Sequence, residues 1–200
     1  KACGLDVAAL CFEQEEKLHQ TEYTQIGMLT VEAAILAAAE QYGLRADVTA
    51  GLSLGEYGAL IASGAMNRTD AFGAVRRRGI LMQEAVPEGG AMAAVLGLDG
   101  ATAKSVCERV KGLVCVANYN CPGQIVITGE KQAVEEACEG MKEAGAKRTV
   151  LLKVSGPFHS PMLKQAGEEL GRILSQMTFG PILVPYLTNV TADYVTDPGD

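Results

Sequence analysis

The stretch Val48-Thr49-Ala50-Gly51-Leu52-Ser53-Leu54-Gly55 decides the fold that we predict for this chain of 200 residues. Residues 48–52 are typical of a short strand, and residues 56–62 favour a helix. Between them, the run from Gly51 to Gly55 fits the pattern Gly-x-Ser-x-Gly, in which the serine lies on a strained turn between a strand and a helix. We expect both glycines to be needed there, because a Cβ atom would clash in so tight a turn. The pattern predicts an α/β fold with Ser53 as a nucleophile; the alternative is a plain glycine-rich turn with an idle serine.

Further helices and strands are predicted on both sides of this turn. Thr24–Tyr42 should form a helix that Gly43 ends, and Ala71–Ala85 a helix that Asn67–Asp70 caps and that Pro87 and Gly89-Gly90 end. The elements predicted after those glycines are strand Ala91–Leu98, helix Ala101–Val110, strand Leu113–Val116, a turn over Asn118–Gly123, strand Gln124–Thr128, helix Lys131–Ala144, strand Arg148–Val154, helix Met162–Met177 and strand Ile182–Asn189.

The order β-α-β-β-α-β over residues 91–154 is the signature of a ferredoxin-like unit. We therefore predict two domains. An α/β-hydrolase-like core of residues 1–90 and 155–200, discontinuous and incomplete, is interrupted by a small ferredoxin-like domain of residues 91–154.

Composition and charge exclude several classes of function. Apolar residues make up 48% of the chain and charged residues 20%, which is typical of a globular protein with a core and excludes a disordered chain. The longest apolar stretch, Ile26–Ala39, is interrupted by Thr30 and Glu32, so no membrane span is expected. The net charge of −7 argues against nucleic-acid binding.

The six cysteines include no Cys-x-x-Cys pair, so we expect no metal and no cofactor, and mostly buried, reduced thiols. Reduced thiols, with no stretch at the N-terminus that resembles a secretion signal, predict a cytoplasmic protein, and we expect it to be a monomer.

A nucleophilic serine needs a base, and the chain has two histidines. His19 lies in a polar stretch and should be a solvated surface residue. His159 lies in the loop Val154–Pro161, which two prolines make rigid, and is the candidate base. The helix after Ser53 directs its N-terminal N–H groups at the same place, so the backbone N–H of Leu54 is the candidate oxyanion donor.

Three stretches of the chain resemble the malonyl-CoA:acyl-carrier-protein transacylases and the related acyltransferase domains of polyketide synthases. Gly51–Tyr57 is similar to the family's Gly-His-Ser-Leu-Gly-Glu-Tyr, Arg78–Gly89 to its arginine-bearing helix, and Val154–Ser160 to its histidine loop. The hairpin predicted over Asn118–Gly129 is also similar to that family.

The resemblance implies roles for three residues. Ser53 is the nucleophile, His159 the base, and Arg78 the residue that binds the free carboxylate of the malonyl group. Helical periodicity agrees, since it places Arg78 at the edge of the apolar face of its helix and Arg77 in solvent. The implied activity is that of an acyl-carrier-protein S-malonyltransferase in fatty-acid synthesis. It transfers malonyl from malonyl-CoA to the phosphopantetheine thiol of acyl carrier protein through a malonyl-serine.

The chain departs from the family pattern in two respects. Leu52 stands where the family has histidine, so any hydrogen bond made by that histidine is missing. The family's N-terminal glutamine, a second oxyanion donor, and its C-terminal group that orients the histidine have no counterpart. We therefore expect a chain truncated at both ends, with weak activity or none.

Two other functions fit parts of the sequence. A serine esterase or lipase would share the serine turn and the histidine and would need an acidic partner between them in the chain. Asp99 falls between them, but it lies at the end of a predicted small-domain strand, where a triad member is not expected. A non-catalytic fragment would only dock a carrier protein, for which Lys147, Arg148 and Lys153 are the candidate basic residues.

Overall fold

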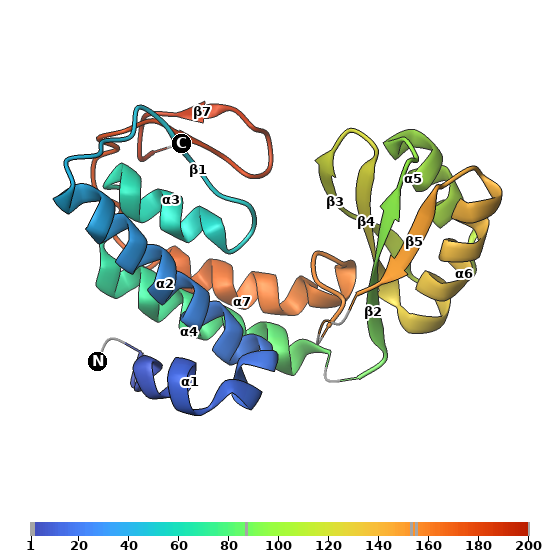
Figure 1. The fold of residues 1–200 in the computed structure, drawn as a ribbon, viewed down its shortest axis with the longest axis horizontal. Coiled ribbons are helices and arrows are strands. Elements are labelled where there is room, and N and C mark those ends of the chain that lie inside the picture. Colours follow the sequence, from blue (N-terminus) through green and yellow to red (C-terminus); the bar gives the residue numbers. More distant parts are fainter. Residues whose placement is uncertain (1–2, 87, 153, 155, 200) are drawn as a thin grey trace. The chain divides into compact units, whose positions relative to one another are not determined.

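The computed structural model describes residues 3–86, 88–152, 154 and 156–199. The chain separates into two units, one of residues 1–80 and 169–200 and one of residues 81–168, each with its own core (Figure 1). The α/β class predicted from the sequence is confirmed.

The first unit is a layer of helices on a small three-stranded sheet. Its elements are α1 (Val7–Glu13), the 3-10 helix η1 (Glu15–His19), α2 (Thr21–Gln41), β1 (Thr49–Ala50), α3 (Gly55–Ser63), most of α4 (Arg68–Ala85), the end of α7 (Lys164–Leu174), β6 (Tyr186–Leu187) and β7 (Tyr194–Val195). The sheet has the order β1-β6-β7, in which β1 and β6 are parallel and β6 and β7 antiparallel. Because β1 and β6 run in the same direction, the segments that follow them leave the sheet at one edge.

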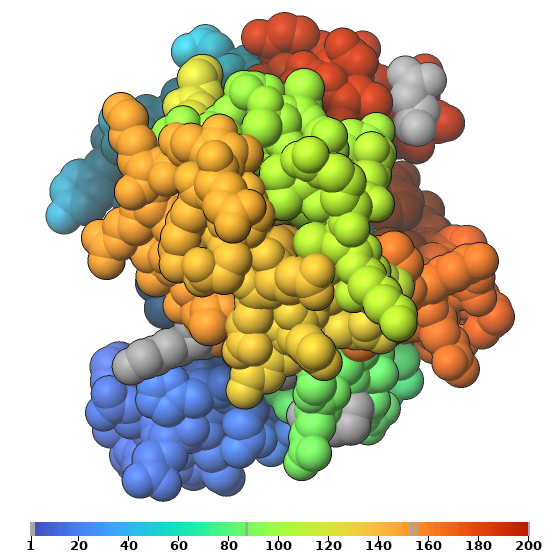
Figure 2. All heavy atoms as spheres, turned by 90° about the vertical axis from the view of Figure 1, so that its right-hand side faces the viewer, coloured from blue at the N-terminus to red at the C-terminus, as the bar shows by residue number. Residues whose placement is uncertain are grey.

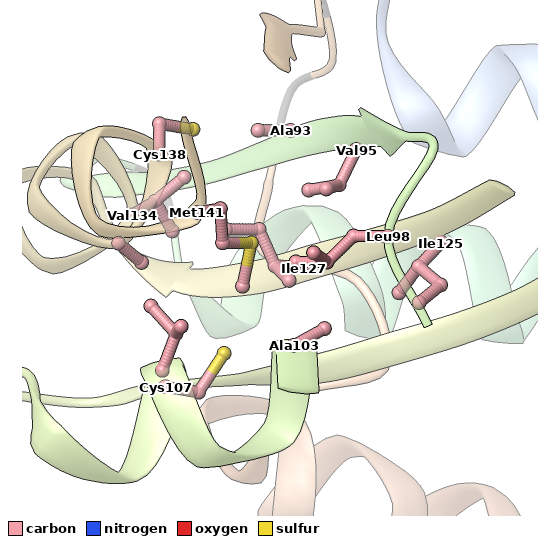
Figure 3. Packing of buried hydrophobic residues seen from close by; sticks show 12 residues of the cluster. Ala93, Val95, Leu98, Ala103, Cys107, Ile125, Ile127, Val134, Cys138 and Met141 are labelled. Carbon is pink, nitrogen blue, oxygen red and sulfur yellow. The ribbon is translucent and has the colours of Figure 1, made fainter. Parts of the chain in front are cut away.

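The second unit is a four-stranded antiparallel sheet with two helices. Its elements are β2 (Gly90–Leu96), α5 (Gly100–Arg109), β3 (Val114–Cys121), β4 (Gln124–Glu130), α6 (Lys131–Glu143), β5 (Arg148–Leu151) and the 3-10 helix η2 (Pro161–Leu163). The strand order is β3-β4-β2-β5. Apolar side chains of α5, α6 and the strands form its core (Figure 3), and the two helices lie at the surface in Figure 2, α5 in lime green and α6 in amber.

Predicted helix ends agree closely with the structure where the sequence supplies capping residues. α2 ends at Gln41, and Gly43 follows with φ +78, the left-handed conformation that glycine tolerates. α4 begins at Arg68, and the Oδ1 of Asn67 accepts a hydrogen bond of 2.9 Å from the N–H of Asp70.

Several predicted strands and turns were wrong in extent. The turn expected over Asn118–Gly123 is only Pro122-Gly123, because β3 continues to Cys121 through two register irregularities. β3 is an edge strand, so its polar residues can face solvent. Their polarity led us to predict that the turn begins at Asn118, although the strand continues to Cys121.

The strand predicted over Ile182–Asn189 is reduced to Tyr186–Leu187. Pro185 lacks the N–H that a strand needs, and the amides of Leu183 and Val184 donate to the carbonyl of Ser63 instead. The predicted helix Met162–Met177 is η2 followed by α7, which ends at Leu174, and the strand predicted to reach Val154 ends at Leu151.

All six cysteines are free, but they are not mostly buried as expected. Cys107 and Cys138 are buried in the second unit, Cys121 is exposed, and the other three are half-buried. Among the described residues, no helix combines the length and the apolar character that a membrane span requires.

Candidate active site

Ser53 lies on the sharp turn that the Gly-x-Ser-x-Gly pattern predicts. Its φ is +54, in the left-handed region that costs a non-glycine residue about 1–3 kcal/mol. The turn closes through hydrogen bonds from the N–H of Gly55 to the carbonyl of Leu52 (3.0 Å) and from the N–H of Glu56 to the carbonyl of Ser53 (3.3 Å). Strain of this kind persists only where other contacts hold the residue.

Only one of the two glycines of the pattern is sterically required. A Cβ atom on Gly51 would lie 2.0 Å from the carbonyl oxygen of Gly55 and 2.4 Å from the nitrogen of Glu56. The backbone of residues 55 and 56 could therefore not approach position 51 as closely as it does. A Cβ atom on Gly55 would meet nothing within 4 Å. The expectation that both glycines avoid a clash is therefore correct for Gly51 and wrong for Gly55.

Asn189, from a distant part of the chain, forms hydrogen bonds with this turn. Its side-chain Oδ1 accepts a hydrogen bond of 2.6 Å from the N–H of Ser53, and its own N–H donates to Oε1 of Glu56 at 2.9 Å. Asn189 follows β6, and Ser53 follows β1, so the parallel pairing of these strands brings the two together. Sequence reasoning missed Asn189, although a polar residue just after a strand was a usable signal.

Arg78 places a guanidinium group beside the hydroxyl of Ser53. Its Nη2 donates to Oγ of Ser53 at 2.9 Å, and its Nη1 donates to Oε1 of Gln25 at 2.5 Å. Gln25 is only 5% exposed, so it is a rigid support for the guanidinium; sequence reasoning missed it as well. Arg77 is exposed, as the helical periodicity predicts.

The surroundings of Arg78 are partly apolar and partly charged. Burial lowers the pKa of Arg78, while the neighbouring Tyr57 and Glu56 act in the opposite direction. Burial also raises the pKa of the Tyr57 phenol. Since arginine has a very high intrinsic pKa, the group beside Ser53 remains a cation at neutral pH.

Leu54 can contribute to chemistry only through its backbone. Its side chain is 7% exposed and belongs to the core of the first unit. The amides of Gly55, Glu56 and Tyr57 already donate hydrogen bonds to carbonyls of the turn. They could donate to a substrate only if these hydrogen bonds broke. The N–H of Leu54 therefore stays the candidate oxyanion donor.

His159 lies in the second unit, on a loop held in an unusual conformation. Its φ is +58 and its side chain is exposed. Next to it, the N–H of Phe158 donates to the carbonyl of Gly156 at 3.0 Å, and Oγ of Ser160 accepts from the N–H of Met162 at 3.3 Å. Ser155 of this loop lies outside the described residues.

The loop is fixed to the sheet by Pro157. This residue is fully buried, and a Cβ atom on Gly90 would lie 2.3 Å from its Cδ. The position of His159 therefore depends on a glycine at the start of β2. His19, the other histidine, is exposed, as predicted.

Asp99 has a structural role in the second unit. Its Oδ1 accepts from the N–H of Thr102 at 2.9 Å and its Oδ2 from the hydroxyl of Thr102 at 2.7 Å, which caps α5. The Thr102 hydroxyl is the main cause that holds the pKa of Asp99 below its usual value. This carboxylate is thus engaged in a helix cap, which leaves the esterase reading without support from Asp99.

The basic residues proposed for carrier docking are only partly described. Lys147 and Arg148 are exposed, and Lys153 lies outside the described residues. Over the described part of the chain, no three His, Cys, Asp or Glu side chains are grouped so that they could hold a metal ion.

The serine turn, the adjacent arginine and the α/β fold are the features to be explained, and comparison with known proteins identifies the family. The chain belongs to the acyl transferase domain family, whose model matches residues 1–198. Over 199 residues it is 47% identical to the malonyl CoA-acyl carrier protein transacylase of Bacillus subtilis, covering 97% of this chain and 63% of that protein.

Solved structures give the same result. The malonyl transacylase of Streptococcus pneumoniae superposes with a TM-score of 0.92 at 43% identity, over 98% of this chain and 65% of that one. A malonyl-transacylase solved in complex with a type II polyketide acyl-carrier protein superposes with a TM-score of 0.94 at 40% identity, over 99% of this chain and 66% of that one. The chain thus spans 63–66% of the length of these relatives.

Proposed function

We propose that the protein transfers a malonyl group from coenzyme A to the phosphopantetheine thiol of an acyl carrier protein, through a malonyl-Ser53 intermediate, in fatty-acid synthesis. The observation that carries this proposal is the distance of 2.9 Å between Nη2 of Arg78 and Oγ of Ser53. A fixed cation beside a nucleophile suits an acyl group that has a free carboxylate at its far end. The transacylases similar to this chain support the same substrate.

In the first half-reaction, His159 takes the hydroxyl proton of Ser53 as Oγ attacks the thioester carbonyl of malonyl-CoA. The N–H of Leu54 stabilises the oxyanion, a contribution of about 3–4 kcal/mol for one such donor. The C–S bond then breaks, and the coenzyme A thiolate leaves with the proton from His159. In the second half-reaction His159 takes the proton of the phosphopantetheine thiol as its sulfur attacks the malonyl ester. The bond between the acyl carbon and Oγ of Ser53 then breaks, and Oγ takes the proton back from His159.

Arg78 has a second task when malonyl is present. Its Nη2 moves from Oγ of Ser53 to the malonyl carboxylate, while Nη1 keeps its bond to Gln25. Each charge-assisted hydrogen bond to a carboxylate is worth about 1.5–3 kcal/mol. An uncharged acyl group offers no acceptor in exchange for Ser53, and this difference is the proposed basis of malonyl selectivity.

The architecture proposed with this function is an α/β-hydrolase-like core of residues 1–90 and 155–200 with a ferredoxin-like insert of residues 91–154. The strand order β3-β4-β2-β5 supports the insert. We propose that the protein acts as a cytoplasmic monomer.

Intact-mass spectrometry after incubation with malonyl-CoA tests the function, with the protein expressed in the longest form that its gene encodes. A malonyl adduct that disappears in Ser53→Ala is expected. Acylation by simple esters but not by malonyl-CoA would establish an esterase instead, and no adduct from either substrate would refute both enzymatic functions.

A matched pair of arginine variants tests the selectivity. Arg78→Ala should lose most of its preference for malonyl-CoA over acetyl-CoA, because the carboxylate loses its partner. Arg77→Ala removes the neighbouring, exposed arginine of the same helix, so it serves as the control and should retain that preference. Equal preference in the two variants would remove Arg78 from the site.

A further inference from the structure

We propose that Asn189 is a positioning residue that holds Ser53 in its reactive left-handed conformation and that Glu56 orients Asn189. The proposal rests on the proposed role of Ser53 as nucleophile. It concerns how the hydroxyl is held rather than which acyl group it accepts.

Asn189 is bound to the Ser53 turn through both its side chain and its backbone. Oδ1 accepts from the N–H of Ser53 at 2.6 Å, and the N–H of Asn189 donates to Oε1 of Glu56 at 2.9 Å. Ser53 lies in the turn and Glu56 in the first turn of α3, and Asn189 and both of its partners are partly buried. Two bonds that meet at one residue fix its position and its side-chain orientation together.

The pairing of β1 with β6 explains how Asn189 reaches the Ser53 turn. β1 pairs with β6 in parallel, with Thr49 opposite Tyr186 and Ala50 opposite Leu187. Ser53 lies three residues beyond the end of β1 and Asn189 two residues beyond the end of β6. The two segments therefore leave the sheet at the same edge, where the side chain of one meets the backbone of the other.

The bond acts on the strained residue itself. Release of this amide removes one of the contacts that hold Ser53 at φ +54, and any rotation toward an ordinary conformation changes the 2.9 Å contact between Oγ and Nη2 of Arg78. The N–H of Ser53 is occupied by Asn189, so it is not an oxyanion donor. This leaves the oxyanion to the next amide, that of Leu54.

The test compares variants that keep an acceptor with variants that lose it. Asn189→Leu has a similar volume and no acceptor, whereas Asn189→Asp keeps Oδ1. Glu56→Leu and Glu56→Gln make the same comparison at the second bond. Val190→Ala, at the exposed neighbour of Asn189, is the control.

The readout is the rate at which a fluorophosphonate labels Ser53, measured by intact mass on folded protein. Oγ of Ser53 forms a bond to the phosphorus of this reagent, the P–F bond breaks and fluoride leaves, and the Ser53 hydroxyl proton passes to the base. The reagent needs no malonyl carboxylate. We expect Asn189→Leu to label about 5- to 150-fold more slowly, the effect of leaving a buried donor without its partner. Glu56→Leu should slow labelling in the same direction, and the Asp and Gln variants should regain most of the lost rate.

Labelling of Asn189→Leu at the rate of the Val190→Ala control would overturn the proposal, as would labelling of Asn189→Asp as slow as that of Asn189→Leu. If the Leu variant at 189 does not fold, the pair at Glu56 decides in the same way. Unaltered protein that labels with fluorophosphonate but forms no adduct with malonyl-CoA would refute the proposed function and leave the role of Asn189 standing. Failure of both reagents would refute both proposals.

Discussion

Replacing each glycine of the Ser53 turn by alanine should give opposite results. The two glycines are equivalent in the sequence pattern, but the structure separates them. An added Cβ atom on Gly51 would lie 2.0 Å and 2.1 Å from the carbonyl oxygen and carbon of Gly55 and 2.4 Å from the nitrogen of Glu56. An added Cβ atom on Gly55 would meet nothing within 4 Å.

The magnitude follows from the contacts. Carbon atoms pack comfortably at about 3.5–4.0 Å, so the turn in Gly51→Ala must open by about 1 Å or more. Overpacking of this kind costs about 1–3 kcal/mol, and the loss of the hydrogen bond from Ser53 to Asn189 adds about 1 kcal/mol. Gly55→Ala places alanine in the first turn of α3, where it gains about 0.5 kcal/mol of helix propensity.

Urea denaturation followed by circular dichroism measures both changes. With a denaturant slope of about 1–3 kcal/mol per molar, a loss of about 3 kcal/mol lowers the urea midpoint by about 1–3 M for Gly51→Ala. The midpoint of Gly55→Ala should be unchanged or slightly higher. Fluorophosphonate labelling of Ser53 should be slow in the first variant and near normal in the second. Equal midpoints and equal labelling for the two variants would show that the close approach at Gly51 does not exist.

Three further outcomes are expected. Gln25→Leu should lower the preference for malonyl over acetyl about tenfold, because Nη1 of Arg78 loses a charge-assisted hydrogen bond. Gly90→Ala should slow labelling of Ser53 by displacing Pro157 and with it the loop of His159. Burial raises the pKa of the Cys107 thiol from 9.0 to about 11. The unfolded chain therefore ionises at lower pH than the folded one, and urea midpoints should fall as pH rises from 9 to 11.

Each of these outcomes has a control. Gln25→Glu keeps an acceptor and should retain more malonyl preference than Gln25→Leu. Gly89→Ala strains the backbone at φ +85 but creates no clash, because nothing lies within 4 Å of the added Cβ atom. Displacement of the His159 loop should therefore occur only in Gly90→Ala. Cys107→Val should flatten the pH dependence of the urea midpoint between 9 and 11; an unchanged slope would assign it to other groups.

The parts of the fold that could be predicted are those that depend on neighbouring residues. The Ser53 turn follows from the Gly-x-Ser-x-Gly pattern between a strand and a helix, and the end of α2 follows from Gly43. The orientation of Arg78 follows from the period of one helix. In each case the atoms that decide the conformation lie within a few residues of one another.

The parts that could not be predicted depend on distant contacts. Asn189 reaches Ser53 only because β6 pairs with β1, and no local pattern reveals that pairing. Gln25 supports Arg78 from another helix, and this contact likewise depends on the packing of segments that are distant in the sequence. The strand predicted over Ile182–Asn189 is too long because its apolar residues indicate a strand throughout. Pro185 has no N–H, and pairing begins only at Tyr186.

The bond between Ser53 and Asn189 also orders events during synthesis of the chain. The two residues are 136 positions apart, and a ribosome that adds about 5–20 residues per second needs roughly 7–27 s to make the second after the first. The unit of residues 81–168 is complete before Asn189 is added, so its sheet can form while the serine turn still lacks its anchor. The second unit of the nascent chain can thus be structured before Asn189 is available to hold the Ser53 turn.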